Sequence, residues 1–211
     1  MDQSQIKVIL YDLGNVILPF NHYQIAEKLA RFSQGDESGG PETIFSYLFA
    51  REQGTINAYE TGKVSTSEFF LDLKKSFRLS LSFGAFVPIW NDIFVENPEV
   101  SEMVLLQKGR WKLGLVSNTN SLHFDYALSK FPILQVFDRW ILSHEVGFKK
   151  PDAEIFHKAM EWASVEPKKI LFIDDMMKNV EAAISSGMQG IHFTSARQLK
   201  EELSKKLTRE G

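Results

Sequence analysis

Four short segments of this chain are almost entirely apolar and show no alternation between apolar and polar residues. They cover residues 6–11, 112–116, 139–142 and 169–173, and residues 190–193 form a fifth, weaker segment of the same kind. Each is rich in Val, Ile, Leu or Phe and too short for an ordinary helix, which is typical of strands buried on both faces of a sheet. The segments therefore predict a parallel sheet that is covered on both sides.

Around these segments the sequence changes to helical spacing. Residues 98–108, 152–163 and 178–187 place apolar side chains three and four positions apart, and the last window ends on a glycine that suits a helix terminus. Alternation of strands and helices is the pattern of an α/β fold with a doubly wound parallel sheet. We expect this fold class.

Residues 18–97 do not follow this alternation of strands and helices. About eighty residues separate the first two strand segments, whereas a crossover between parallel strands needs only a dozen or so residues plus its helix. Helical windows here cover residues 23–32, 42–51, 66–77 and 83–94, and Ser65 with Glu68 predicts a capping box at the start of the third. We expect residues 1–17 and 98–211 to form the α/β core, and residues 18–97 to form a helical insertion over the end of the first strand.

The composition argues against several classes of protein. The 211 residues include 24 Lys or Arg and 27 Asp or Glu, so the formal net charge is −3. A protein that binds the nucleic-acid backbone normally has a net basic surface, so we expect no nucleic-acid partner. The chain has no cysteine, which excludes disulfides and thiolate metal sites. Because the sequence shows no targeting segment and no membrane-spanning run, we expect a cytoplasmic protein with no membrane partner. The oligomeric state stays open.

Polar residues stand where three of the strand segments end. Asp12, Gly14 and Asn15 follow the first segment, Ser117 and Asn118 the second, and Asp174 and Asp175 the fourth, while Lys150 precedes the helix expected at residues 152–163. The carboxyl ends of parallel strands meet at one edge of a sheet, where ligands bind in open α/β folds, so we expect these residues to lie together. The adjacent Lys149 is expected to be an ordinary solvated lysine.

The three aspartates predict a metal site. Asp12, Asp174 and Asp175 supply hard oxygen ligands of the kind that Mg²⁺ prefers. A buried aspartate is costly unless it is paired or bound to a metal, and three clustered carboxylates would repel one another without a cation. With its charge screened by Mg²⁺, an aspartate can act as a nucleophile and form an aspartyl-phosphate.

The remaining groups suit a phosphoryl group. Lys150, the hydroxyl of Ser117 and the backbone amide of Asn118 would neutralise and hold phosphate oxygens. Simpler roles stay open for some of these residues. Asp175 could be the N-cap of the helix after it, and the segment from Ser117 to Thr119 could cap the next helix.

Four motifs in this order resemble those of the haloacid-dehalogenase-like (HAD) superfamily: Asp12-x-Gly-Asn-Val, Ser117-Asn, Lys150-Pro-Asp and Asp174-Asp175. The segments DLGNVI, YETGKVS, SNTNSLH and GFKKPDAEIF also resemble the α-D-glucose-1-phosphatase-like branch. The resemblance covers essentially the whole chain. It implies a HAD-like Rossmannoid core, with residues 18–97 as the helical cap that follows the first strand.

The resemblance also implies roles for individual residues. Asp12 would be the nucleophile, and Asp12, Asp174 and the carbonyl of Gly14 would bind Mg²⁺, with Asp175 binding the metal directly or through its water shell. Gly14, Asn15, Ser117, Asn118 and Lys150 would contact the substrate, with Ser117 and Lys150 holding its phosphate. Lys150 would also take part in catalysis by neutralising charge.

One position departs from the family pattern. Most phosphatases of the family carry an aspartate two residues after the nucleophile as general acid and base, but here that position is Gly14. General acid–base catalysis typically contributes about 10²–10⁴-fold to a rate. We therefore expect a substrate with a relatively acidic leaving hydroxyl, such as the anomeric hydroxyl of a sugar 1-phosphate. His22, Tyr59, Glu60 or water are candidates to replace the missing acid.

The function expected from the sequence is a Mg²⁺-dependent phosphatase. Its substrate would be a small phosphorylated metabolite, such as a hexose 1-phosphate, hydrolysed through an aspartyl-phosphate. Three alternatives stay open. A 2-haloacid dehalogenase would use the same nucleophile on carbon without Mg²⁺. A binding or regulatory protein would keep the site with little turnover because of Gly14, and a phosphotransferase would pass the group to a second sugar.

Overall fold

Five strands form one parallel sheet in the computed structural model, which describes residues 6–34, 40–49 and 55–207. They are β1 (Val8–Tyr11), β2 (Lys112–Ser117), β3 (Arg139–Leu142), β4 (Ile170–Asp174) and β5 (Gln189–His192). The strand order is β3-β2-β1-β4-β5, and every neighbouring pair is parallel. The predicted fold class is confirmed, with the first strand of the chain at the centre of the sheet.

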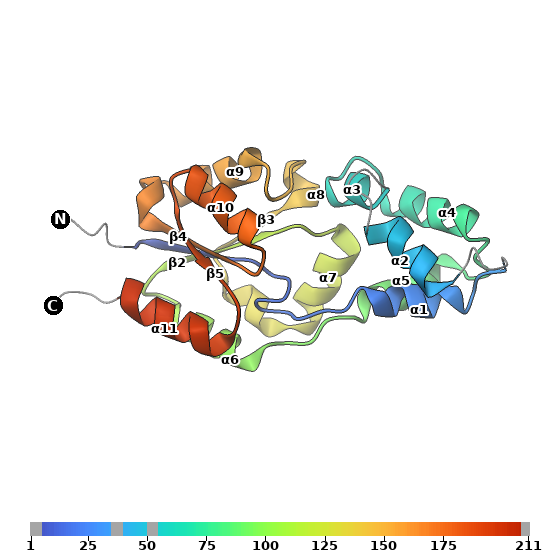
Figure 1. Cartoon of the computed structure of the whole chain (residues 1–211), viewed down its shortest axis with the longest axis horizontal. Coiled ribbons are helices and arrows are strands. Elements are labelled where there is room, and N and C mark those ends of the chain that lie inside the picture. Colours follow the sequence, from blue (N-terminus) through green and yellow to red (C-terminus); the bar gives the residue numbers. More distant parts are fainter. Residues whose placement is uncertain (1–5, 35–39, 50–54, 208–211) are drawn as a thin grey trace.

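Helices of the core cover both faces of this sheet. They are α6 (Pro98–Gln107), α7 (Ser121–Lys130), α8 (Ser143–Val146), α9 (Ala153–Ala163), α10 (Met177–Ser185) and α11 (Ala196–Lys206), with 3₁₀ segments at Pro132–Val136 and Pro167–Lys169. In Figure 1, α9 and α10 lie above the sheet, and α6 and α11 lie below it. The core is therefore a three-layer α/β structure.

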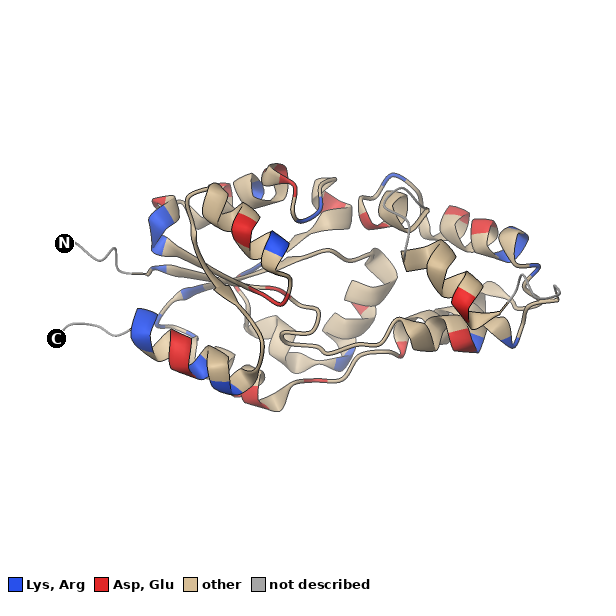
Figure 2. Cartoon of the chain, viewed as in Figure 1, with Lys and Arg blue, Asp and Glu red and all other residues tan. Residues whose placement is uncertain are grey.

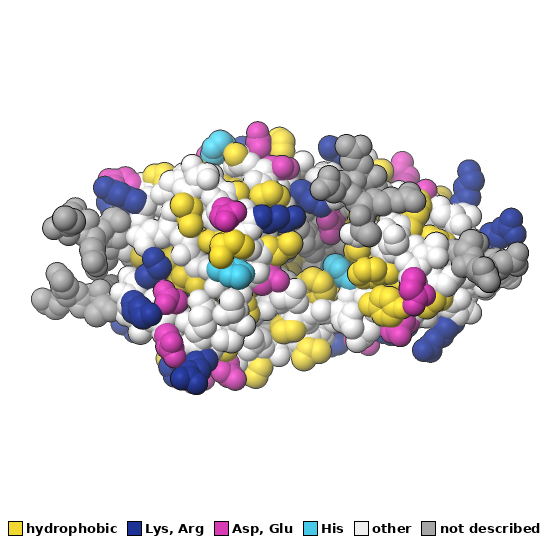
Figure 3. All heavy atoms as spheres, viewed as in Figure 1, with side chains coloured by type: hydrophobic (Ala, Val, Ile, Leu, Met, Phe, Trp, Pro, Cys, Tyr) yellow, Lys and Arg dark blue, Asp and Glu magenta, His cyan; other side chains and the backbone are white. Residues whose placement is uncertain are grey.

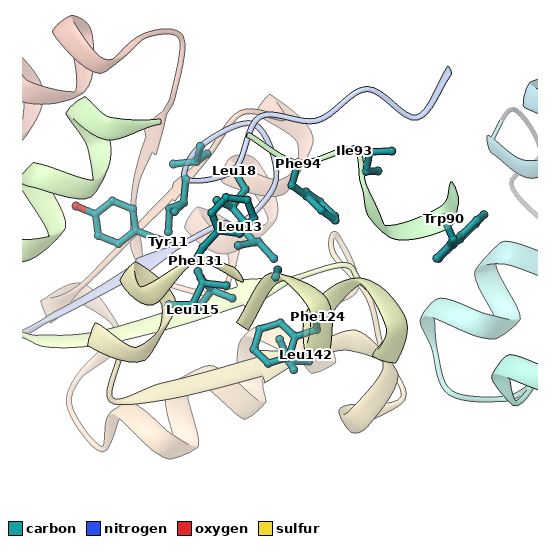
Figure 4. Close-up of a cluster of buried hydrophobic side chains, with 14 of the residues drawn as sticks. Tyr11, Leu13, Leu18, Trp90, Ile93, Phe94, Leu115, Phe124, Phe131 and Leu142 are labelled. Atoms are coloured by element: carbon teal, nitrogen blue, oxygen red, sulfur yellow. The ribbon is translucent and has the colours of Figure 1, made fainter. Parts of the chain in front are cut away.

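Side chains of β1 alternate between the two faces. Ile9 and Tyr11 belong to one hydrophobic cluster, and Val8 and Leu10 belong to the other. All four are buried, as expected for a strand covered on both sides. The first cluster continues beyond the sheet toward the insertion, where Figure 4 shows further side chains of the same group, including Trp90.

The helical insertion lies at one end of the core, on the right in Figure 1. It consists of α1 (Tyr23–Ala30), α2 (Pro41–Phe49), α3 (Thr55–Glu60), α4 (Thr66–Ser76) and α5 (Phe83–Asn91). Its interior is aromatic: Trp90 packs against Phe69 and Phe86, with ring centroids 4.9 and 5.5 Å apart. The capping box at Ser65 and Glu68 is present as predicted.

Two linkers join the insertion to the core and run side by side. Phe20 and Phe94 form an isolated antiparallel bridge. The amide of Val95 donates to the carbonyl of Pro19, and that of Asn97 donates to Ile17, each at 2.9 Å. These bonds hold the start and the end of the insertion together.

The sequence patterns predicted most elements and missed some. β2 and β4 extend one residue further than predicted, to Ser117 and Asp174, because these polar residues continue the ladder opposite Leu142 and His192. None of the helical segments expected from the sequence included α3, a short helix whose Ile56 and Tyr59 are buried. A helix of one to two turns depends on tertiary packing more than on local propensity. The last two residues of the helix expected at residues 42–51 lie outside the described residues.

Charges of both signs are mixed over the helices in Figure 2. Among the described residues, no helix has the length and apolar character needed to cross a bilayer.

We expect Gly62→Ala to weaken the contact between the insertion and the core. Gly62 follows α3 with φ +68°, and a Cβ there would overlap the backbone carbonyl oxygen of His144 in α8. A strained backbone conformation of this kind costs about 1–3 kcal/mol, so the melting temperature should fall by several degrees. Gly84→Ala in the first turn of α5, where the nearest atom to a Cβ would be Oγ of Ser82 at 4.0 Å, is the matched control and should be neutral or slightly stabilising. Equal melting temperatures for the two variants would contradict the expectation.

Candidate active site

Three neighbouring strands bring their polar ends to one edge of the sheet. Asp12 follows β1, the central strand of the sheet. Ser117 ends β2 on one side of β1, and Asp174 ends β4 on the other side. Asp175 continues from Asp174, and Lys150 enters from the loop before α9. Residues far apart in the sequence therefore lie together, in the arrangement that the sequence analysis expected.

Lys150 is the centre of this cluster. Its ammonium group lies 2.6 Å from Oδ1 of Asp12 and 2.7 Å from Oδ2 of Asp174, and it donates to the carbonyl of Val116 at 2.9 Å. Only 1% of the Lys150 side chain is exposed. Its three donors thus have three acceptors, which satisfies a buried ammonium group completely.

The close approach of these charges changes their pKa values. Burial by itself would lower the pKa of Lys150, but the carboxylates of Asp12 and Asp174 outweigh this effect and raise it. Burial raises the pKa of Asp12 to about 7, with Lys150 opposing the shift and Asp174 adding to it. Lys150 therefore keeps its charge at neutral pH, and Asp12 titrates near neutrality.

The three aspartates fit a divalent cation. Asp12, Asp174 and Asp175 each offer a carboxylate oxygen, and these oxygens lie within 4.8 Å of one another. Against the single ammonium of Lys150, three carboxylates leave two negative charges, which one Mg²⁺ would balance. All three are hard oxygen ligands. The carbonyl of Gly14 stays a predicted fourth ligand.

Two asparagines position the acidic residues. Asn179 of α10 donates to both oxygens of Asp174 at 3.0 and 3.1 Å, and the amide of Met176 donates to Oδ1 at 2.8 Å. Asn15, in a left-handed conformation with φ 55°, donates to Asp175 at 3.0 Å. No local sequence signal marks Asn179, which stands at an ordinary helical position. The substrate contact expected for Asn15 stays a prediction, since the observed partner of its side chain is the carboxylate of Asp175.

Asn118 holds the loop that carries Lys150. Its side chain donates to the backbone carbonyl of Lys150 at 2.9 Å and accepts from the backbone amide of Lys150 at 2.7 Å. The Asn118 side chain is therefore a positioning group, which leaves its backbone amide for the predicted phosphate contact.

The simpler capping roles are wrong. Asn120, not the preceding Ser117–Thr119 segment, caps α7 by accepting from the amide of His123 at 3.1 Å. Likewise, Asp175 does not cap α10, because Met176 holds the N-cap position and makes no side-chain cap bond.

Lys149 is not the solvated lysine that the sequence suggested. It reaches across to the insertion, where it donates to Asn57 and forms an ion pair with Glu60 at 3.2 Å. Burial raises the pKa of Glu60, although Lys149 opposes the shift. Because charge partners on another element cannot be read from local sequence, only the fold could assign this role.

Two of the three side chains that are candidates for the missing acid interact with other residues. Glu60 is paired with Lys149. The hydroxyl of Tyr59 lies 3.0 Å from that of Thr66, and the Tyr59 ring stacks on Phe69. The third candidate side chain is His22. It holds the N-cap position of α1 but makes no side-chain hydrogen bond to cap that helix.

Protons and Mg²⁺ are expected to compete for Asp12. Because the pKa of Asp12 is raised to about 7, this carboxyl is mostly protonated at pH 6 and mostly ionised at pH 8 in the metal-free protein. The affinity for Mg²⁺ should therefore rise about tenfold between these pH values. Isothermal titration calorimetry at both pH values measures this. Asp12→Asn cannot titrate and should lose the pH dependence, whereas equal affinities in the wild-type protein would show that no competition occurs.

The chain is similar in sequence to hydrolases. The family described as haloacid dehalogenase-like hydrolase matches residues 55–193, more than half of the chain. A D-ribitol-5-phosphate phosphatase from Bacteroides thetaiotaomicron is 24% identical over 206 residues, which cover 94% of this chain and 97% of that protein. A phosphorylated carbohydrates phosphatase from Thermotoga maritima is 30% identical over 105 residues, 49% of each protein.

Solved structures share the fold. A HAD family enzyme from B. thetaiotaomicron, in complex with magnesium and inorganic phosphate, has a TM-score of 0.79 at 24% identity and covers 90% of this chain and 94% of that one. A protein from Porphyromonas gingivalis described as a predicted HAD-like family hydrolase has a TM-score of 0.82 at 22% identity, over 98% and 100% of the two chains. Taken with the family match, the parallel sheet and the acidic cluster at its edge establish that this chain belongs to the haloacid dehalogenase-like hydrolases.

Proposed function

We propose that this protein is a Mg²⁺-dependent phosphatase acting on a small phosphorylated carbohydrate. The observation that carries the proposal is the buried ammonium of Lys150 between Asp12 and Asp174, with Asp175 as a third carboxylate at the same edge of the sheet. This combination of one ammonium and three carboxylates, with Ser117 at the end of the strand next to β1, supports phosphoryl transfer, which depends mainly on positioning and charge neutralisation.

In this mechanism Asp12 is the nucleophile. One of its carboxylate oxygens bonds to phosphorus while the bond from phosphorus to the ester oxygen breaks. Water then attacks phosphorus and breaks its bond to the aspartyl oxygen, which releases inorganic phosphate and restores Asp12. Lys150 neutralises negative charge, and Ser117 holds a phosphate oxygen. When bound by the aspartates, Mg²⁺ would supply further charge neutralisation.

Residues 18–97 are proposed to act as a cap over this site. Such a cap excludes bulk water and selects the substrate. The ion pair of Lys149 and Glu60 supports the role, because it connects α3 of the insertion to the residue next to Lys150. The close approach of Gly62 to the backbone of His144 is a second contact between the two parts.

The relatives support a carbohydrate substrate. One is named for D-ribitol 5-phosphate, and another for phosphorylated carbohydrates. D-Ribitol 5-phosphate is an ester of a primary alcohol, whereas Gly14 favours a more acidic leaving group such as that of a hexose 1-phosphate. A substrate screen should therefore include both kinds of ester.

We expect the wild-type protein to hydrolyse p-nitrophenyl phosphate with Mg²⁺ and to stop when the metal is chelated. Asp12→Asn should lower kcat at least about 10³-fold, because it removes the nucleophile. Asp125→Asn, at an exposed position of α7, is the matched control and should keep full activity. Steady hydrolysis by Asp12→Asn, or by the chelated wild-type protein, would contradict the mechanism.

A second measurement separates the remaining alternatives. Release of chloride from 2-chloropropionate without Mg²⁺ would indicate a dehalogenase instead. Phosphate binding with Mg²⁺ but no turnover on any ester would indicate a binding protein. Transfer of the phosphoryl group to an added sugar, faster than release of inorganic phosphate, would indicate a phosphotransferase.

A further inference from the structure

An aromatic ring fills the place where a side chain at position 14 would lie. A Cβ added to Gly14 would come within 2.6 Å of Cε1 of Phe20. Phe20 is joined to Phe94 by a backbone bridge where the two linkers meet, and the two rings make an edge contact with centroids 6.0 Å apart. An aspartate at position 14 is therefore opposed by packing as well as missing from the sequence.

His22 packs directly on this ring. The ring centroids of His22 and Phe20 lie 4.3 Å apart. His22 also stacks on Phe49, with ring centroids 4.2 Å apart. His22 holds the N-cap position of α1 without capping it, and its imidazole forms no hydrogen bond with any residue that the structure describes. Burial lowers the pKa of His22 to about 4, so the ring is neutral at pH 7.

The neighbouring His123 behaves differently, although its ring is stacked near His22 with centroids 6.2 Å apart. Its Nδ1 lies 3.1 Å from Asn120 Nδ2, and its Nε2 lies 2.9 Å from the carbonyl oxygen of Trp90. Both nitrogens of His123 therefore serve the local structure. His22 has the same kind of aromatic surroundings, but within residues 6–34, 40–49 and 55–207 neither of its ring nitrogens has a hydrogen-bond partner.

These positions suggest what that partner is. The residue two positions after the nucleophile is the one that acts on the leaving group in the family pattern. Here the ring of Phe20 occupies the space of its absent side chain, and His22 packs on that ring. Figure 3 shows hydrophobic side chains, with a histidine among them, at the surface where the core meets the insertion. An aromatic surface with one polar group suits the organic part of a carbohydrate ester.

We propose that His22 contacts the leaving group and donates an N–H hydrogen bond to the ester oxygen as its bond to phosphorus breaks. This inference rests on the proposed phosphatase function. The phosphoryl group passes to Asp12, the electron pair of the broken bond stays on the leaving oxygen, and that oxygen takes its proton from a water molecule. A neutral imidazole can stabilise developing negative charge in this way without ionising itself.

The test uses two esters that differ in their need for such help. In p-nitrophenyl phosphate the leaving oxygen is already stable as an anion, whereas in a sugar or sugar-alcohol phosphate it is not. His22→Phe keeps the aromatic stacking and removes both nitrogens. We expect it to lower kcat/KM about 10–100-fold on the sugar phosphate that the wild-type protein hydrolyses fastest, as for loss of a hydrogen bond to a charged group. On p-nitrophenyl phosphate the change should stay within about twofold.

Two variants serve as controls. His22→Gln keeps an N–H donor and should recover part of the activity on the sugar phosphate. His157→Phe, at an exposed position of α9, should change neither activity. Equal losses on both esters, or unchanged hydrolysis of the sugar phosphate by His22→Phe, would overturn the role of His22. If the wild-type protein hydrolysed neither ester with Mg²⁺, the proposed function itself would be wrong.

Discussion

The ammonium group of Lys150, buried between two carboxylates, is the interaction on which the rest of the site depends. A buried charge is costly unless it is paired, so each member of the trio with Asp12 and Asp174 makes the burial of the others possible. Removal of one member would leave uncompensated charge in the interior. The two carboxylates raise the pKa of Lys150 and so keep it charged, while burial raises the pKa of Asp12 to about 7 against the opposing effect of Lys150.

The sheet topology makes this trio possible. Because β1 lies between β2 and β4, Asp12, which follows β1, has the end of β2 on one side and the end of β4 on the other. Hydrogen bonds around the trio then fix its geometry: Asn118 holds the backbone of Lys150, and Asn179 holds Asp174. The functional groups are therefore supported by a residue that follows β2 and by a residue of α10, as a site that needs accurate positioning requires.

The insertion contributes chemistry of another kind. Its contact with the core combines the polar pair of Lys149 and Glu60 with an aromatic cluster that includes Phe20 and His22. Consecutive lysines thus have different tasks, since Lys150 neutralises the carboxylates of the core while Lys149 connects to the insertion. The aromatic side places the ring of Phe20 where Gly14 lacks a side chain, and His22 packs on that ring without capping α1.

The sequence by itself determined the fold class, and it predicted the place of the insertion and the polar residues at the strand ends. These features depend on periodicity and on the parallel direction of the strands. It could not identify Asn179 or the partner of Lys149, and it left α3 unrecognised. It also gave no sign that Phe20 fills the space at Gly14. Each of these depends on contacts between residues that are distant in the chain, and local patterns carry no record of such contacts. Only the tertiary structure decided which groups meet, because packing and charge pairing act through space.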